Sequence, residues 1–260
     1  MKIGFFDSGL GGITILSAVR ELIPEYDYLY FGDTANLPYG DRTEEEIHAL
    51  TYAGIKRLFD SGALLVIVAC NTASVSSVRK YQDEMLAVEY PGRKVLGVII
   101  PTVETLLDSG ASSVLLIGTE RTIQSDKYAI ELKKSEVSLT LHTRATPRLV
   151  PLIEAGEHNL ACEYALQVVG EVAHHVDTVV LGCTHYTLIK ECLRRTHPSH
   201  TIISQDEIIP YKLKDYLIRH PEIEGQLTRE GSVEVDLSAE SPTYKKIMEN
   251  LCSQYQTPLP

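Results

Sequence analysis

The sequence has no run of the roughly 20 apolar residues that a helix needs to cross a bilayer, so we expect no membrane-spanning segment. It also has few cations, with 24 Lys and Arg against 35 Asp and Glu and a net charge of −11. A nucleic-acid phosphate backbone is therefore not an expected partner. The amino-terminal stretch MKIGFFDSGLGG is too short in apolar residues for a signal peptide and predicts a first β-strand.

Motifs for metals and cofactors are also missing. The glycine-rich stretch Phe6–Gly12 lacks the Lys-Ser/Thr of a phosphate loop and does not match G-x-G-x-x-G. The pair His174-His175 has no HExxH context, and no cysteine has a partner at zinc-finger spacing. No lysine stands in a motif for a Schiff base. We expect neither a metal nor a cofactor.

The five cysteines include no CxxC pair, which predicts a reduced chain in the cytoplasm. A free cysteine is usually a small buried hydrophobe. We expect that role for three of them, Cys162, Cys192 and Cys252.

Strand-like and helical patterns alternate along the 260 residues, of which 44% are hydrophobic. This order predicts an α/β fold with parallel strands and helices on both faces. The expected strands are Lys2–Phe6, Tyr28–Phe31, Leu64–Ala69, Val95–Ile99, Ser113–Ile117, Ser138–His142, Thr178–Leu181 and Gly231–Leu237. The expected helices are Gly11–Leu22, Thr43–Ser61, Thr72–Met85, Pro101–Gly110, Ser125–Lys134, Leu160–His174, His185–Arg195 and Pro242–Leu251. Between Ser204 and Gly231 the chain is more polar and less periodic, and no element is expected there.

A faint internal repeat suggests two similar halves. Similar stretches begin at Lys2 and Ser113, 111 residues apart, and Cys70 and Cys183 are 113 residues apart. The alternative is that any two α/β segments align this well by chance. The repeat favours a boundary near Val98–Pro101. The expected domains are residues 1–98 plus 206–252, and residues 99–205.

Two stretches with matched patterns carry the strongest functional signal. In both IVACNTAS at Ile67–Ser74 and VVLGCTHYT at Val179–Thr187, an apolar run ends in a small residue, a cysteine and a polar pair. Each cysteine is thus expected at the carboxyl end of a buried strand, where open α/β sheets bind ligands. Unpaired N–H groups at a helix start there attract anions and lower the pKa of a thiol. Two such cysteines facing one ligand make a two-base site.

Other polar residues also follow expected strands. Asp7 and Ser8 end the first strand, where Asp7 can accept a hydrogen bond from a thiol or an ammonium group, or simply cap the next helix. The loop Gly32–Gly40 can close over a ligand with backbone amides, or be an ordinary connection. His185 can orient or protonate at the second cysteine, or face solvent at a helix start.

Together these stretches resemble the glutamate racemases, cofactor-independent enzymes of the aspartate/glutamate racemase superfamily. The resemblance lies in FDSGLGG, GDTANLPYG, ACNTAS and GCTHY, with further likeness in GTERTIQSDKY and TPRLVPLIEAG. Two departures stand out. Thr187 replaces the proline that usually follows HY, and the late segment after the last expected buried strand reads IISQDEIIPYK in place of the usual acidic and small residues.

The resemblance implies two pseudo-symmetric parallel-sheet α/β halves with the active site in the cleft between them. By position, Cys70 and Cys183 are the acid/base thiols, Asp7 supports Cys70 and His185 supports Cys183. The substrate-binding residues that it implies are Ser8, Pro38, Tyr39, Gly40, Asn71, Thr72, Thr184 and Glu154.

The expected function is conversion of L-glutamate to D-glutamate for peptidoglycan. Two alternatives remain open at this point. One is aspartate racemisation by the same chemistry, and the other is binding of an acidic amino acid without catalysis. A homo-oligomer is possible, since members of the family differ in assembly.

Overall fold

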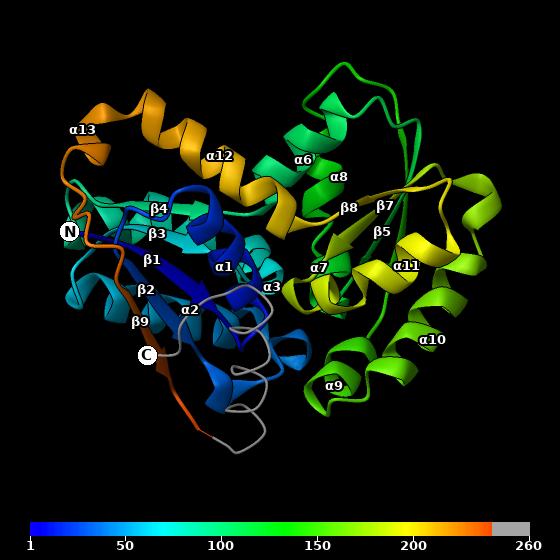
Figure 1. Cartoon of the computed structure of the whole chain (residues 1–260), viewed down its shortest axis with the longest axis horizontal. Helices are drawn as coiled ribbons and strands as arrows, with labels where there is room; N and C mark the ends of the chain where they lie inside the picture. The colour runs from blue at the N-terminus through cyan, green and yellow to red at the C-terminus, as the bar shows by residue number, and fades with distance from the viewer. Residues whose placement is uncertain (241–260) are drawn as a thin grey trace.

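The computed structural model describes residues 1–240, which form two sheets of parallel strands (Figure 1). The first sheet has the order β4-β3-β1-β2-β9 and the second the order β6-β5-β7-β8. The strands are β1 (Lys2–Asp7), β2 (Tyr28–Gly32), β3 (Ala63–Val68), β4 (Lys94–Gly97), β5 (Ser113–Gly118), β6 (Thr140–Ala145), β7 (Thr178–Gly182), β8 (Thr201–Ile203) and β9 (Val233–Leu237). The predicted α/β class with parallel strands is confirmed.

The two sheets repeat one topology. Strands β1 to β4 lie in the order β4-β3-β1-β2, and β5 to β8 lie in the equivalent order β8-β7-β5-β6. The predicted internal repeat therefore corresponds to two similar α/β halves. Strand β9 adds to the first sheet beside β2, so the chain returns to the first half. The domain limits themselves stay a prediction, and the expected helix Pro242–Leu251 lies outside the described residues.

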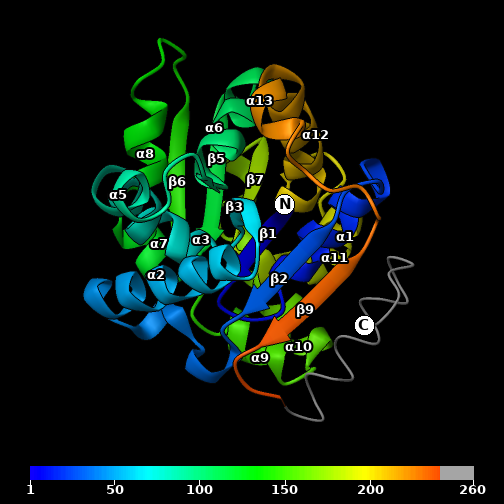
Figure 2. The same cartoon turned by 90° about the vertical axis from the view of Figure 1, so that its left-hand side faces the viewer.

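Helices cover both faces of the first sheet (Figure 2). Helix α2 (Glu44–Asp60) packs on β1, β2 and β3, and α1 (Gly12–Leu22) packs on β1 and β2. α2 starts at a capping box, in which Thr43 and Glu46 each accept a hydrogen bond from the other's backbone amide. After β3 one helical run contains α3 (Asn71–Ala73), η3 (Ser74–Val78), α4 (Arg79–Tyr81), η4 (Gln82–Leu86) and α5 (Ala87–Glu89), of which η3 and η4 have wider π-helical turns.

The helices of the second half differ in detail from the predicted ones. They are α6 (Ile99–Asp108), α7 (Glu120–Gln124), α8 (Lys127–Leu132), α9 (Leu149–Glu154), α10 (His158–Gly170), η5 (Ala173–His175), η6 (Thr184–Ile189) and α11 (Lys190–Thr196). The predicted helix Ser125–Lys134 runs only through α8, because Asp126 is left-handed with φ 51° and separates it from α7. Helix α6 begins two residues before Pro101, so the predicted strand Val95–Ile99 ends too late.

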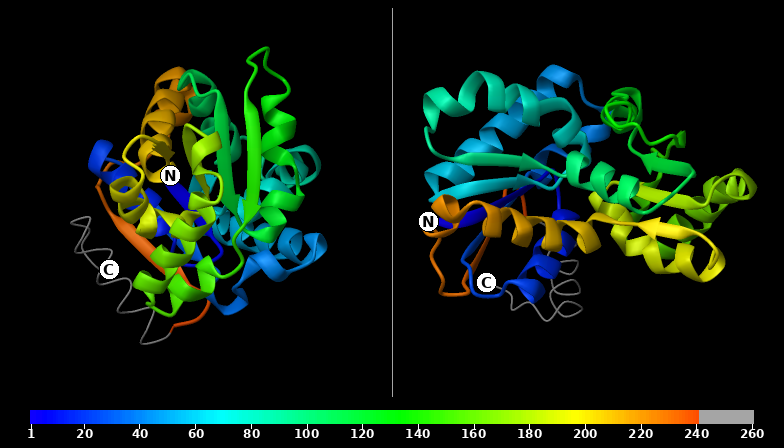
Figure 3. Two further views of the ribbon diagram at one scale, coloured as in Figure 1. Left: turned by 90° about the vertical axis from the view of Figure 1, so that its right-hand side faces the viewer. Right: turned by 90° about the horizontal axis from the view of Figure 1, so that it is seen from above.

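Two helices lie where the sequence predicts none, α12 (Gln205–Arg219) and α13 (Pro221–Glu224). The prediction of an irregular segment after Ser204 is therefore wrong. α12 has a buried apolar stripe, formed by Ile208, Ile209, Leu213 and Leu217. Pro210 and the polar residues on the outer face make the helical period of this stripe hard to recognise in the sequence. α12 packs on α1 and α6, and it runs from the second half across to the first (Figure 3).

One apolar core is shared by both halves. It joins Phe5 of β1 and Leu16 of α1 to Leu116 of β5 and Val180 of β7, with Leu213 of α12 among them. Two further clusters lie within the halves, one around α2 and the other around α9, α10 and α11. The shared core holds the two sheets in a fixed relation. No helix described within residues 1–240 is both long and apolar enough to cross a bilayer.

Cys162 of α10 and Cys192 of α11 form a disulfide, with their Cα atoms 6.3 Å apart. The prediction that both are free, reduced and buried is therefore wrong. The two residues are 30 positions apart, and only the packing of α10 on α11 brings them together, so their spacing carried no signal. Cys70 and Cys183 are free and buried, and Cys252 lies outside the described residues.

The close approach of α2 to β1 yields a stability prediction. A Cβ on Gly54 would lie 2.2 Å from Cε2 of the buried Phe6 ring. We expect Gly54→Ala to lower the free energy of unfolding by about 1–3 kcal/mol, because this overlap exceeds the gain of about 1 kcal/mol in helix propensity. Urea denaturation measures the change.

Gly170→Ala is the matched control, because nothing lies within 4 Å of a Cβ built there at the end of α10. It should leave the free energy of unfolding unchanged or raise it by up to about 1 kcal/mol. Equal effects of the two substitutions would contradict the close contact between Gly54 and Phe6.

Candidate functional site

The carboxyl ends of the two sheets face one cavity, which we call the cleft. Cys70 follows β3 and Cys183 follows β7, the equivalent strands of the two halves. Both free thiols line the cleft although each residue is buried. The lining residues are Ser8, Leu37, Pro38, Tyr39, Gly40, Asp41, Cys70, Asn71, Thr72, Thr119, Glu120, Thr146, Pro147, Val150, Pro151, Cys183, Thr184 and His185. The two matched stretches thus meet at one site.

The thiol of Cys70 caps the helical run that begins at Asn71. Its Sγ accepts a hydrogen bond from the amide of Ala73 at 3.4 Å and lies 3.4 Å from Oγ of Ser8. Burial, with the negative charge of Asp7 adding to it, raises the pKa of Cys70 to about 12. Cys70 is therefore a protonated thiol near neutral pH.

Asp7 joins the two halves. One carboxylate oxygen accepts from the amide of Gly9 at 2.9 Å, and the other accepts from the hydroxyl of Thr184 at 3.1 Å. Burial raises the pKa of Asp7, and the positive charge of His185 opposes that rise. Gly11 permits this closeness, because a Cβ there would lie 2.5 Å from Oγ1 of Thr184 and 2.9 Å from Nδ1 of His185.

His185 lies between a thiol and a carboxylate. Its Nδ1 is 3.8 Å from Sγ of Cys183, and its Nε2 is 2.5 Å from Oε1 of Glu154, which belongs to α9. Burial lowers the pKa of His185, but the hydrogen bonds to Cys183 and Glu154 outweigh it and raise that pKa well above the usual value. An imidazolium with Nδ1–H directed at Cys183 stabilises a thiolate there. Glu154 is not among the lining residues. It contacts Nε2 of His185, whereas Nδ1 is the ring nitrogen nearest Cys183.

The loop between β2 and α2 contains the short 3₁₀ turns η1 (Thr34–Asn36) and η2 (Tyr39–Asp41). Pro38, Tyr39 and Gly40 line the cleft, and their role in substrate binding stays a prediction. The side chain of Tyr39 is buried and its hydroxyl donates to Asp33 at 2.7 Å, which anchors the side chain within the loop.

Three threonine hydroxyls lie close together between the two halves. Thr72 belongs to the first half, and Thr119 and Thr122 belong to the second. Oγ1 of Thr72 lies 2.9 Å from that of Thr119 and 3.5 Å from that of Thr122. Thr119 and Thr146 line the cleft and were not singled out from the sequence. Both follow strands of the second sheet directly, so the strand-end argument used for the cysteines would have found them.

Asn71 is held by residues that do not line the cleft. Its Nδ2 donates to Oε1 of Gln205 at 2.7 Å, and its Oδ1 accepts from Nε2 of Gln205 at 2.7 Å. The hydroxyl of Tyr128 donates to the same oxygen at 2.8 Å. Gln205 belongs to the segment in which this chain departs from the family pattern.

Within residues 1–240, no group of three or more His, Cys, Asp or Glu side chains is placed to hold a metal ion. Charged groups lie next to each thiol, with Asp7 near Cys70 and the Glu154–His185 pair at Cys183.

Comparison with known proteins places this geometry in one family. The sequence model of the Asp/Glu/Hydantoin racemase family matches residues 14–209. The chain is 36% identical over 247 residues to a protein named glutamate racemase from Ruegeria pomeroyi, covering 86% of this chain and 88% of that protein.

Solved structures agree. The crystal structure of glutamate racemase from Francisella tularensis in complex with D-glutamate has a TM-score of 0.85 at 26% identity, covering 97% of this chain and 93% of that one. The structure of glutamate racemase from Thermus thermophilus in complex with β-chloro-D-alanine has a TM-score of 0.80 at 30% identity, covering 96% and 92%.

The contact between His185 and Glu154 can be tested by titration. Because the pKa of His185 is raised in the fold, its interactions stabilise the protein fully below the unfolded-state pKa of about 6.5. This stabilisation is lost as the pH rises through the folded-state pKa. Glu154→Gln removes the carboxylate charge, so we expect the pKa of His185 in NMR titration to fall and the loss of stability to move to lower pH.

Glu157→Gln is the matched control, since Glu157 is an exposed carboxylate three residues along the chain. It should leave the His185 titration in place. An unchanged His185 titration in Glu154→Gln would show that the carboxylate does not hold the imidazolium.

Proposed function

Because the chain belongs to the Asp/Glu/Hydantoin racemase family, we propose that it is a glutamate racemase that inverts the α-carbon with two thiols and no cofactor. One observation carries the proposal. The only two free cysteines among the described residues line the same cleft. Each follows the equivalent strand of one of the two similar halves.

The chemistry requires groups on both faces of the substrate. The α-proton of an amino acid is weakly acidic, so its removal needs a base and an environment that stabilises the developing carbanion. Inversion then needs an acid on the opposite face. Cys70 and Cys183 come from opposite halves and supply one group to each face.

We propose that the reaction from L to D starts with a thiolate on Cys183 and a thiol on Cys70. The imidazolium of His185 supports a thiolate on Cys183, whereas burial and Asp7 keep Cys70 protonated. In the proposed step the Cys183 thiolate removes the α-proton and its S–H bond forms as the Cα–H bond breaks. The electron pair left on the α-carbon then takes the proton of Cys70 on the other face, and Cys70 becomes the thiolate. The resemblance assigns Cys183 to the L enantiomer, so this starting state serves conversion of L to D.

Binding is assigned to polar groups around the thiols. We propose that Ser8, Asn71, Thr72 and Thr184 hold the ammonium and carboxylate groups of glutamate, and that the loop residues Pro38, Tyr39 and Gly40 contact the distal carboxylate. Asp7 acts at Cys70, and Glu154 acts through His185. The product D-glutamate would serve peptidoglycan synthesis in the cytoplasm.

The substrate proposal is tested on enzyme dialysed exhaustively against chelator, with L-glutamate and L-aspartate supplied separately. Chiral chromatography should detect D-glutamate with nothing added back. Racemisation of aspartate alone would identify an aspartate racemase. Calorimetric binding of glutamate without any racemisation would identify a binding protein, and activity restored only by a metal or pyridoxal phosphate would overturn the direct thiol mechanism.

The two thiols are tested singly. Cys70→Ser and Cys183→Ser should each lower kcat by a factor of about a hundred to ten thousand, because a hydroxyl is a far weaker base than a thiolate. The double variant Cys162→Ser/Cys192→Ser is the control and should keep parental kcat while losing about 2–4 kcal/mol of stability with the disulfide. A single serine variant with near-parental racemisation would mean that one base suffices.

A further inference from the structure

The first turn of α12 contacts the segments that follow both thiols. It contains three consecutive polar residues, Gln205, Asp206 and Glu207. Gln205 bonds to Asn71, which follows Cys70, and the two carboxylates bond to Lys190, which ends the turn that follows Cys183. None of the three lines the cleft, so any effect on the reaction passes through these partners.

The contact with the Cys70 side is a reciprocal amide pair. Gln205 and Asn71 exchange two hydrogen bonds of 2.7 Å, and the side chains are each about 2% exposed. Nε2 of Gln205 also lies 3.4 Å from the hydroxyls of Thr102 and Tyr128. A buried side-chain amide that has hydrogen-bond partners for both its oxygen and its nitrogen has one favoured orientation. Rotating the amide by 180° would place N–H donors against other donors. The pair therefore fixes how Asn71 faces the cleft.

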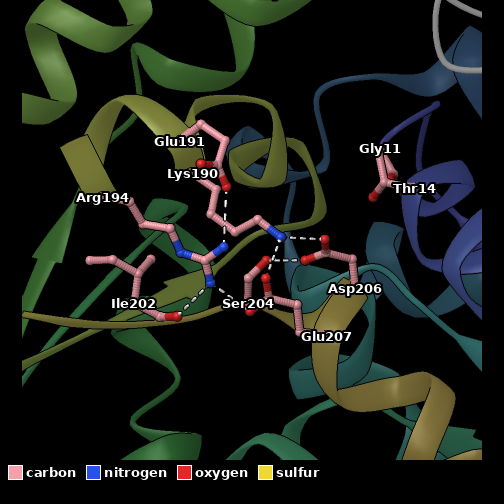
Figure 4. A network of polar contacts seen from close by, with 9 residues as sticks. All are labelled: Gly11, Thr14, Lys190, Glu191, Arg194, Ile202, Ser204, Asp206 and Glu207. Atoms are coloured by element: carbon pink, nitrogen blue, oxygen red, sulfur yellow. Dashed lines mark hydrogen bonds and ion pairs between the residues drawn. The ribbon is translucent and has the colours of Figure 1, made fainter. Parts of the chain in front are cut away.

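The contact with the Cys183 side is an ion cluster around the buried Lys190 (Figure 4). Nζ of Lys190 is 2.5 Å from Asp206 and 2.9 Å from Glu207, and Lys190 is only 7% exposed. Ser204 donates a short hydrogen bond to Asp206, and Arg194 donates to Glu207 at 2.7 Å. Both carboxylates lie in the first turn of a helix, where the helix dipole favours negative charge.

Lys190 follows η6 directly, and η6 contains Thr184 and His185. A buried ammonium that loses its carboxylates cannot stay in place without a large penalty, so the end of η6 is held to α12. η6 also contacts α1, whose start lies against Thr184 and His185 at Gly11. The segment after Cys183 is thus held at both of its ends.

Resting on the function proposed above, we propose that the first turn of α12 is the element that sets how Cys70 and Cys183 face each other, with Gln205 as a positioning residue for the Cys70 side. The side chains of one helical turn hold the segment after each thiol, in addition to the shared core and the Asp7–Thr184 hydrogen bond.

Gln205→Leu removes both hydrogen bonds to Asn71. The proposal predicts that removal of the α-proton by one thiol is then less often followed by delivery of a proton from the other. We expect kcat/KM for glutamate to fall about a hundredfold, the scale on which small misplacements cost rate. In heavy water, deuterium should also accumulate in the recovered substrate, because a carbanion that waits for the second thiol leaves time for the S–H of the first thiol to exchange with solvent, and the resulting S–D then returns deuterium to the original face. Gln167→Leu, an exposed glutamine on α10, is the matched control and should keep parental values.

Lys190→Met tests the other contact and should also raise deuterium in the recovered substrate, with Lys214→Met on the exposed face of α12 as its control. Gln205→Glu keeps the acceptor for Asn71 but loses the donor, so an intermediate kcat/KM is expected. If Gln205→Leu does not fold, kcat/KM and substrate deuteration are compared between Gln205→Glu and the parent instead. Either variant, Gln205→Leu or Lys190→Met, could instead have a lower thermal midpoint but parental kcat/KM and parental deuteration of the substrate. That result would show a purely structural role for the contact and overturn the proposal.

A second readout does not require racemisation. The amide of Ala73 holds Sγ of Cys70, so loosening Asn71 should raise the rate at which iodoacetamide alkylates Cys70, followed by peptide mass spectrometry. Absence of racemisation in the parent refutes the proposed function but leaves this rate measurable. An unchanged alkylation rate in Gln205→Leu counts against the positioning role whatever the parent's activity.

Discussion

The hydrogen bond from Thr184 to the buried carboxylate of Asp7 is the interaction on which the site depends. It joins the end of β1 in one half to the segment after β7 in the other, at the place where both thiols lie. It forms because Gly11 has no side chain, so the backbone at Thr184 and His185 can approach the start of α1. A carboxylate this deeply buried requires such donors.

The two halves share a strand order but differ in the charges around their thiols. On the first side, burial and Asp7 raise the pKa of Cys70 to about 12 and favour the neutral thiol. On the second side, Glu154 and His185 place a cation against Cys183. In the proposed mechanism this difference provides one base and one acid at the same time, and the two thiols exchange these roles when the direction of the reaction is reversed. Helix α12 contacts α1 and α6, and its first turn bonds to Asn71 after Cys70 and to Lys190 beyond Cys183, so the same helix contacts the segments that follow both thiols.

The parts that the sequence predicted are those with a local signal. Alternating apolar runs identified the parallel sheets, and the matched context of Cys70 and Cys183 identified the strand ends that meet at the cleft. The parts that it missed depend on packing between distant segments. Cys162 and Cys192 pair only because α10 packs on α11, and Gln205 reaches Asn71 across 134 residues. α12 was missed because Pro210 and its polar face obscure the period of its apolar stripe.

The two-thiol arrangement is tested most directly by the fate of the α-proton in the parent enzyme. L-glutamate is converted in heavy water to low extent, and the deuterium at the α-carbon is measured separately in the D and L enantiomers. Two facing thiols predict product that is almost fully deuterated and recovered substrate that is still largely protiated, since one thiol removes the proton and the other delivers one exchanged with solvent. Product that retains the original proton would show that a single group carries it across, and would contradict the two-thiol mechanism.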